Sequence, residues 1–197
     1  MSQTYVIKVS ASVREEVSAS DKRKKRLVLT EICDAQEQRE ILKERLQDHG
    51  WAEKEGSQGK VWTRTDGDVT QTLDLDDMSV EAEVTLERVL ERERTITVVG
   101  DRDRTDPDAH RSKEKQELEE RIAIKEEEKQ QVEEALQEEI AETLDATESE
   151  RTQGLNEIVR EVYAESLKRK AQRLGSVTEV REGRDGQDYE LVIKITE

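Results

Sequence analysis

RSKEKQELEERIAIKEEEKQQVEEALQEEIAETLDATESERTQGLNEIVREVYAESLKRKAQRL, residues 111–174, is the stretch that decides how this chain folds. It contains no proline and one glycine, and its apolar residues recur at the three- and four-residue spacing of a helix. The segments before and after it alternate as β-strands do. We therefore predict an α+β protein in which a long charged helical element lies between the later strands.

The helical element divides into two amphipathic parts. The apolar residues of the first part are Leu118, Ile122, Val132, Leu136, Ile140 and Leu144, and those of the second are Leu155, Ile158, Val159, Val162, Leu167, Ala171 and Leu174. Between them lies DATESERTQG, a polar stretch rich in helix-capping residues. Residues 111–150 hold 6 basic and 15 acidic side chains, whereas residues 151–174 hold 6 basic and 3 acidic ones. Opposite net charge favours a charged antiparallel helical hairpin, and the alternative is one uninterrupted helix of about 96 Å at 1.5 Å per residue.

The N-terminal part begins with a strand and continues to a short helix. Residues 4–13 alternate as in a strand, residues 18–26 are expected to form a basic, polar loop, and residues 27–33 a second strand. Asp34 starts a capping-box pattern that predicts a helix start. Its buried stripe would be Ile41, Leu42 and Leu46, and Gly50 would end the helix because a C-terminal cap often needs positive φ. Trp51 is then expected to pack on the core.

A small, mostly antiparallel sheet is predicted from the strands that follow. Asp66-Gly67 favours a hairpin between residues 60–64 and 69–75, and two further strands cover 80–86 and 94–99. Residues 100–110 contain the only proline and predict the loop that leaves the sheet.

The chain returns to strand after Gly175. Residues 177–182 and 187–196 flank a turn at Arg184-Asp185-Gly186, and we expect the apolar last strand to pair with the first strand. The domain prediction is a body at 1–110, a helical hairpin arm at 111–174, and a β-hairpin at 175–197 that completes the body.

Composition limits the class of protein. Charged residues make up 42% and apolar residues 32%, so the core should be thin. A net charge of −16 disfavours nucleic acid and anionic membranes as partners, because both repel an acidic protein. The single Cys33 excludes an intrachain disulfide. No run approaches 18 apolar residues, and the first residues lack a long apolar stretch, so we expect a cytoplasmic protein without a membrane segment.

The sequence offers little for catalysis or cofactors. His49 and His110 have no Ser or Cys motif nearby, there is no G-x-S-x-G elbow, and no glycines are spaced to hold a phosphate. Cys33, at a predicted strand end, is interpreted as a small core residue. We therefore predict no catalytic residues, no cofactor and no enzyme activity.

Two acidic groups have the carboxylate ligands that a hard cation such as Ca²⁺ prefers. In the first, Asp101, Asp103, Asp106 and Asp108, the EF-hand spacing fails because positions 5, 6 and 12 are Thr105, Asp106 and Ser112. The second group, Asp74, Asp76 and Asp77, consists of polar residues at a strand end. We predict no metal site at either place.

One short segment is strongly basic, although the chain as a whole is acidic. Five successive bases follow Asp21, namely Lys22, Arg23, Lys24, Lys25 and Arg26. The simplest interpretation is an exposed loop whose charge is offset by the acidic helical element, and the functional one is a contact with an acidic protein partner. Nucleic acid is the weakest reading, since no aromatic residues interleave to stack bases. The five bases are our candidate partner-contact residues.

Two segments carry a family resemblance. They are GLNEIVREVYAESLKRKAQRLGSVTEVREGRDGQDYELVIKITE at residues 154–197 and ILKERLQDHGW at residues 41–51. The first is an amphipathic helix with Tyr163 near its middle, a break at Gly175, and a strand, an Asp-Gly turn and a closing strand; the second is a helix ending in Gly50-Trp51. Together they resemble a family of conserved open reading frames of unknown function in plastids and cyanobacteria, with bacterial relatives described as components of FtsH ternary systems. The charged block from residue 111 to about residue 150 departs from that pattern.

The resemblance implies a cytoplasmic α+β protein that acts beside an AAA+ ATPase, and it offers no catalytic residues. Our leading hypothesis is a non-enzymatic accessory or adaptor protein of a bacterial AAA+ ATPase-containing system, acting by protein–protein contact. The alternative is a self-assembling structural module, a homo-oligomer whose helices pair between chains. A nucleic-acid-associated factor comes third and an enzyme fourth.

Overall fold

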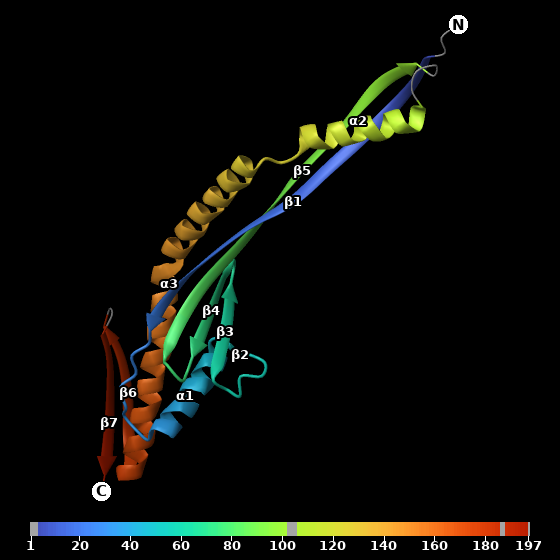
Figure 1. Ribbon diagram of the computed structural model, residues 1–197. Coiled ribbons are helices and arrows are strands. Elements are labelled where there is room, and N and C mark those ends of the chain that lie inside the picture. Colours follow the sequence, from blue (N-terminus) through green and yellow to red (C-terminus); the bar gives the residue numbers. More distant parts are fainter. Residues whose placement is uncertain (1–3, 102–105, 186–187, 197) are drawn as a thin grey trace. The chain divides into compact units, whose positions relative to one another are not determined.

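The computed structural model describes residues 4–101, 106–185 and 188–196 and has an α+β fold (Figure 1). The elements in chain order are β1 (Thr4–Arg26), α1 (Ala35–Asp48), β2 (Ala52–Glu53), β3 (Val61–Asp66), β4 (Val69–Asp74), β5 (Ser79–Asp101), α2 (Pro107–Ile122), α3 (Glu126–Leu174), β6 (Ser176–Asp185) and β7 (Asp188–Thr196). One sheet has the order β1-β5-β4-β3-β2, and β6 and β7 form a second sheet of two strands. The predicted fold class, α+β with a mostly antiparallel sheet, is confirmed.

Helix α1 forms where its capping residues predict it. The Asp34 side chain accepts hydrogen bonds from the backbone N–H groups of Gln36 and Glu37, which have no partner inside the helix. The helix ends before Gly50, whose φ of 77° is the left-handed conformation expected of a glycine C-cap. Its predicted stripe is fully buried and consists of Ile41, Leu42 and Leu46.

The hairpin of β3 and β4 is confirmed as well. Asp66 pairs with Val69, so Gly67 and Asp68 form a two-residue turn, and Gly67 has a φ of 58°. Strand β4 then pairs with β5 from Asp74 opposite Ser79 to Val69 opposite Val84.

Strand β1 is longer than predicted, and this corrects two expectations. Residues 18–26 belong to the strand and do not form a loop, whereas residues 27–33 contain no strand. The alternation of buried residues continues through Val17 and Ala19, although the three residues before Val17, Arg14, Glu15 and Glu16, are charged. Strand β5 likewise joins the two predicted strands at 80–86 and 94–99 into one.

The predicted helical hairpin is wrong at its turn. Residues 145–154 lie inside α3, which runs for 49 residues from Glu126 to Leu174, and the break in the helical region comes instead between α2 and α3 at residues 123–125. Leu144 and Leu155 are 11 residues apart, which is three helical turns, so the apolar face continues across the polar stretch. Burial of that face outweighs the turn preference of the residues between.

The contacts divide the chain into two compact units, and the division into a body, a helical arm and a C-terminal hairpin stays a prediction. Unit 1 comprises residues 1–20 and 85–140, and unit 2 comprises residues 21–84 and 141–197. The core of unit 1 joins Ile7, Val9 and Ala11 of β1 to Leu118 and Ile122 of α2. Strands β1 and β5 and helix α3 each contribute residues to both units.

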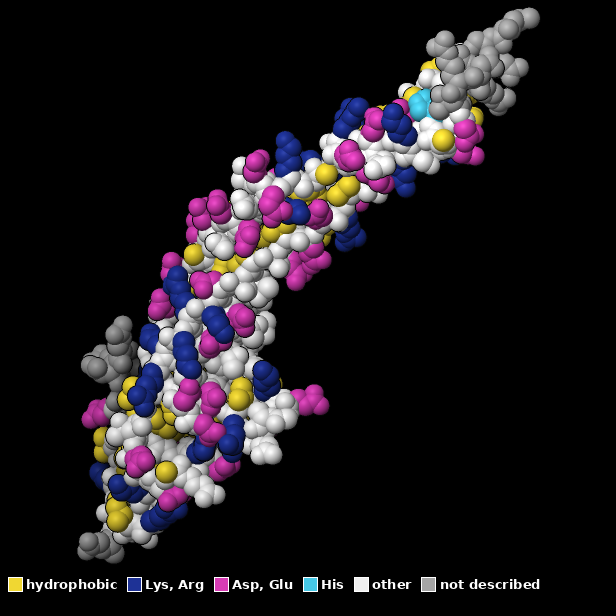
Figure 2. All heavy atoms as spheres, in the orientation of Figure 1, with side chains coloured by type: hydrophobic (Ala, Val, Ile, Leu, Met, Phe, Trp, Pro, Cys, Tyr) yellow, Lys and Arg dark blue, Asp and Glu magenta, His cyan; other side chains and the backbone are white. Residues whose placement is uncertain are grey.

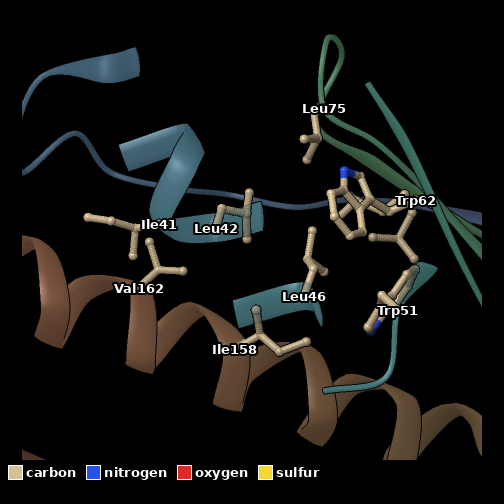
Figure 3. Close-up of a cluster of buried hydrophobic side chains, with 10 residues drawn as sticks. Ile41, Leu42, Leu46, Trp51, Trp62, Leu75, Ile158 and Val162 are labelled. Atoms are coloured by element: carbon tan, nitrogen blue, oxygen red, sulfur yellow. The ribbon is translucent and has the colours of Figure 1, made fainter. Parts of the chain in front are cut away.

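Helix α3 contributes side chains to the hydrophobic core of unit 2. Figure 3 shows the α1 side chains facing Ile158 and Val162 of α3, with Trp51 and Trp62 beside them. The buried members are Ile41, Leu42, Leu46, Trp51, Trp62, Leu73, Leu75, Val80, Ile158 and Val162. The expected packing of Trp51 on the core is confirmed, since 4% of it is exposed.

The C-terminal strands correct one further expectation. Strand β7 pairs with β6 in a separate sheet and does not join the sheet that contains β1, where β1 pairs with β5. The alternation of apolar and polar residues in β7 predicts a strand with one buried face, but it does not predict which strand pairs with β7. Gly175 connects helix α3 to β6 and lies close to the end of β7, since a Cβ atom there would lie 2.7 Å from both the Ile195 side chain and the Thr196 carbonyl oxygen. Part of the predicted turn, Gly186, lies outside the described residues.

Candidate partner-contact site

The five bases Lys22–Arg26 form the last five residues of strand β1, in unit 2. Because successive side chains of a strand point to opposite sides, Lys22 and Lys24 lie on one side and Arg23 and Lys25 on the other. Their partners divide in the same way.

The first pair of bases contacts β5, the neighbour of β1 in the sheet, and the turn that precedes β5. Lys22 Nζ lies 3.1 Å from Glu81 Oε1 of β5, and Lys24 Nζ lies 3.0 Å from Asp77 Oδ2 in the β4–β5 turn. The hydrogen bond to Asp77 raises the pKa of Lys24. The pKa of Asp77 is lowered, mainly by the hydroxyl of Ser79 and then by Lys24. These contacts hold the end of β1 against β5 and its turn.

The second pair contacts helix α3. Arg23 forms an ion pair with Asp145, and this hydrogen bond lowers the pKa of the Asp145 carboxyl group. Lys25 Nζ lies 3.9 Å from Glu148 Oε1 and 3.5 Å from Thr152 Oγ1. All these acidic residues lie in the stretch predicted as a turn, so the helix presents a row of acceptors along the strand end. The expectation that acidic residues of the helical element offset the basic run agrees with these contacts.

The run stays open to solvent despite its ion pairs. The side chains of Lys22, Lys24 and Lys25 are 61%, 55% and 63% exposed, and Arg26 is exposed. A surface pocket of about 500 Å³ borders on Lys24, Lys25 and Arg26 and on residues 76–79. Exposed ion pairs of this kind contribute little to stability, because solvent screens their charges. Figure 2 shows the general setting, with Lys and Arg side chains interspersed among Asp and Glu.

Comparison with known proteins assigns nearly the whole chain to one family. The sequence model of FtsH ternary system domain X5 matches residues 1–196. The chain belongs to this X5 family. No curated protein and no solved structure matches it. The FtsH ternary system relationship suggested by residues 41–51 and 154–197 is therefore confirmed, while the link to plastid and cyanobacterial reading frames stays a prediction.

The two histidines of this X5 family member lie in different units. His49 Nε2 is 3.1 Å from Glu161 Oε1 in unit 2. His110 Nδ1 is 2.8 Å from Tyr5 Oη in unit 1, and its Nε2 is 3.3 Å from Glu114 Oε1. Cys33 is half-buried and packs against the core of unit 2, as expected of a small core residue. Each of these residues has a structural contact, and the absence of enzyme activity stays a prediction.

In the two acidic groups, Asp106 and Asp76 have structural partners. Asp106 accepts from the Ala109 N–H as the N-cap of α2, and the Asp101 and Asp103 side chains lie outside the described residues. Asp76 Oδ2 lies 2.9 Å from Lys60 Nζ, and its Oδ1 lies 2.5 Å from a nitrogen of Arg39. No group of three or more His, Cys, Asp or Glu residues with metal-binding geometry occurs in the part of the chain that the structure describes. None of the described helices has the length and apolarity needed to cross a membrane.

Sequence reasoning missed a pair of pockets in unit 2 that share polar residues. One pocket of about 420 Å³ and another of about 500 Å³ are both lined by Gln71 and Arg151. Gln71 is 4% exposed, and burial lowers the pKa of Arg151. The Arg151 guanidinium donates to the Leu144 carbonyl oxygen at 2.6 Å and contacts Thr147 Oγ1 at 3.2 Å. The sequence does indicate that Gln71 is buried, because Gln71 lies between Val69 and Leu73 in a two-residue repeat and so shares the buried face of β4 with them.

Proposed function

We propose that this X5 family member is a non-enzymatic accessory protein of an FtsH ternary system, and that it works as an adaptor by direct contact with an AAA+ ATPase. The observation that carries the proposal is the family match over residues 1–196, because a component of a ternary system acts together with other components. The non-enzymatic part rests on the sequence, which has no nucleophile elbow and no phosphate-binding loop.

The proposed contact surface is the basic end of β1. Lys24, Lys25 and Arg26 are exposed and adjacent, and the net charge of the chain is −16, so this run differs in sign from most of its surroundings. A protein partner with an acidic segment would be attracted to the run and repelled elsewhere, which fixes where it binds. Binding would exchange weak internal ion pairs with Asp77 and Glu148 for pairs with the partner.

A binding measurement with purified components tests this proposal. The AAA+ ATPase of the same ternary system is titrated with the wild-type chain and with a Lys24→Glu/Lys25→Glu variant. We expect the variant to bind at least about tenfold more weakly, and wild-type binding to weaken as salt is added, because screening acts on exposed charges.

The matched control carries the same charge change in unit 1, at the exposed residues Lys8 and Arg94. The Lys8→Glu/Arg94→Glu variant should bind as tightly as the wild type. Circular dichroism of all three proteins checks that the strand end still folds without its internal ion pairs. Equal affinity of the two variants would contradict the proposed contact surface, and absence of binding by the wild type would contradict the adaptor role itself.

A further inference from the structure

The two-stranded sheet at the C-terminus has one edge that nothing described in this structure covers. Strand β6 lies beside helix α3, where Glu182 forms an ion pair with Lys168 (Figure 1). Strand β7 pairs with β6 on one side only, and within residues 4–101, 106–185 and 188–196 no strand pairs with its other side. An unpaired edge presents free backbone N–H and C=O groups to any strand of matching pattern.

The register of the hairpin determines which backbone groups are free. Asp185 pairs with Asp188, two positions of the sequence separate them, and the pairing continues through Arg181 opposite Val192. Residues flanking a two-residue turn exchange hydrogen bonds, and this close pairing then recurs at every second pair of an antiparallel ladder. Val192 therefore bonds toward β6, whereas Leu191 and Ile193 direct their N–H and C=O groups to the open edge.

The sequence of this edge is complementary to itself. If two copies of β7 lie antiparallel about Val192, Leu191 of each copy is opposite Ile193 of the other, and Glu190 is opposite Lys194. Glu190 is exposed, and the Lys194 side chain, which also forms an ion pair with Glu179 of β6, is 59% exposed. Two opposite-charge pairs and two hydrogen-bonded apolar pairs then form at once, which is the arrangement a two-fold symmetric interface requires.

We propose that the open edge of β7 binds the β7 strand of a second copy of this chain, in the antiparallel register centred on Val192. The edge of the hairpin thereby becomes the middle of a four-stranded sheet, β6-β7-β7-β6.

Two registers displaced toward the C-terminal end of β7 lack the same complementarity. Centring the pair on Lys194 places like charges opposite each other, and centring it on Ile193 leaves Glu190 opposite Thr196. A shift by one residue would place apolar side chains on the polar side of the sheet, because strand side chains alternate. The chosen register instead extends the apolar face of the hairpin, on which Val180 and Ile195 are each 41% exposed, across both copies.

This interface is separate from the proposed contact at Lys22–Arg26, and it also differs from the pairing of helices between chains that the sequence suggested. It requires neither an AAA+ ATPase nor an acidic partner. The test therefore uses the purified chain alone, and its result does not depend on the adaptor role.

Sedimentation velocity over a range of concentrations tests the proposal with two single charge reversals. We expect the wild type to show a concentration-dependent dimer. Glu190→Lys places Lys opposite Lys194, and Lys194→Glu places Glu opposite Glu190, so each variant should be monomeric where the wild type is dimeric. An equimolar mixture of the two variants should form a heterodimer, because each 190–194 pair is again of opposite charge.

The mixture is the decisive arm, since two misfolded variants would not restore a dimer by being combined. Glu142→Lys, at an exposed position of α3, is the control for net charge and should dimerise like the wild type. A wild type that stays monomeric at every concentration would overturn the proposal. So would a dimer that both single reversals leave intact, because its interface must then lie elsewhere.

Discussion

The Tyr5 hydroxyl oxygen lies 2.8 Å from Nδ1 of His110, and this contact joins the start of strand β1 to the first turn of helix α2. The two rings meet edge to face, with centroids 5.9 Å apart. Gly100 of β5 completes the arrangement, because a Cβ atom there would lie 2.3 Å from the Tyr5 ring. Residues about a hundred positions apart in the sequence therefore hold this end of unit 1 together. Substitutions at Tyr5 and Gly100 test their contributions to stability one at a time.

Replacing Tyr5 by Phe keeps the ring and removes the hydroxyl group. Since the hydrogen bond is partly buried, its loss should cost about 0.5–1.5 kcal/mol of local stability. Hydrogen exchange of the backbone amides of α2 measures this, and we expect faster exchange there with little change in unit 2. Unchanged protection of α2 would show that the contact contributes nothing to its docking.

Replacing Gly100 by Ala should destabilise unit 1 through a clash with the Tyr5 ring. The ring is a terminal group and can shift, so we expect a cost of about 1–3 kcal/mol, as for overpacking. A double-mutant cycle with Tyr5→Ala isolates the cause, because Gly100→Ala should cost much less once the ring is absent. An equal cost in both backgrounds would point to the backbone of β5 and not to the ring.

The α1–α3 contact in unit 2 predicts a large effect of core truncation. Leu46 is fully buried in the cluster that includes Ile158, so Leu46→Ala should lower the free energy of unfolding by about 2–5 kcal/mol. Val28 is 74% exposed, and Val28→Ala should change it by no more than about 0.5 kcal/mol. Urea unfolding of both variants measures the difference, and similar values for the two would be inconsistent with this core.

Gly154 distinguishes a continuous α3 from the helical hairpin that the sequence suggested. It lies inside the helix, and an added Cβ atom would meet nothing within 4 Å. Gly154→Ala should therefore stabilise the protein by about 0.5–1 kcal/mol, the usual difference between the two residues in a helix interior. In a turn with positive φ the same change would be destabilising, so thermal unfolding of this one variant gives the answer by its sign.

Acid should weaken unit 2 through its aspartates. Lys60 and then Arg39 lower the pKa of Asp76, and Arg23 lowers that of Asp145. A carboxyl group with a lowered pKa in the folded state stabilises the protein above its unfolded pKa of about 3.9, and this stabilisation is lost as the pH falls toward the folded value. The urea midpoint should thus drop below about pH 4, and Asp76→Asn should show a smaller drop. The same drop in both proteins would exclude Asp76 as a source.

Local chemistry explains which elements were predictable. Three predicted features depend only on residues that are neighbours in the sequence, and all three are confirmed. They are the Asp34 cap, the positive φ of Gly50 and the turn after Asp66. The candidate bases Lys22–Arg26 end a strand and do not lie in a loop, and their role as partner contacts stays a prediction.

The remaining errors share a cause, which is that tertiary contacts override local preference. Glu15 lies among the inward-facing residues of β1 and pairs with Lys129, so a polar residue does not interrupt that strand. Gly154 and the polar residues before it stay helical because Leu144 and Ile158 on either side are buried. The partner of β7 was unpredictable, since an alternating pattern specifies a face and not a neighbour.

The adaptor role is tested most directly by affinity purification from native-host lysate with all 197 residues of the chain present. A linker in place of residues 111–174 would remove Ile158 and Val162 from the core of unit 2, so the comparison uses the wild type, Lys24→Glu/Lys25→Glu and the unit 1 control. We predict that wild type and control recover an AAA+ ATPase and that the Lys24/Lys25 variant does not. Recovery of no AAA+ ATPase by the wild type would contradict the account.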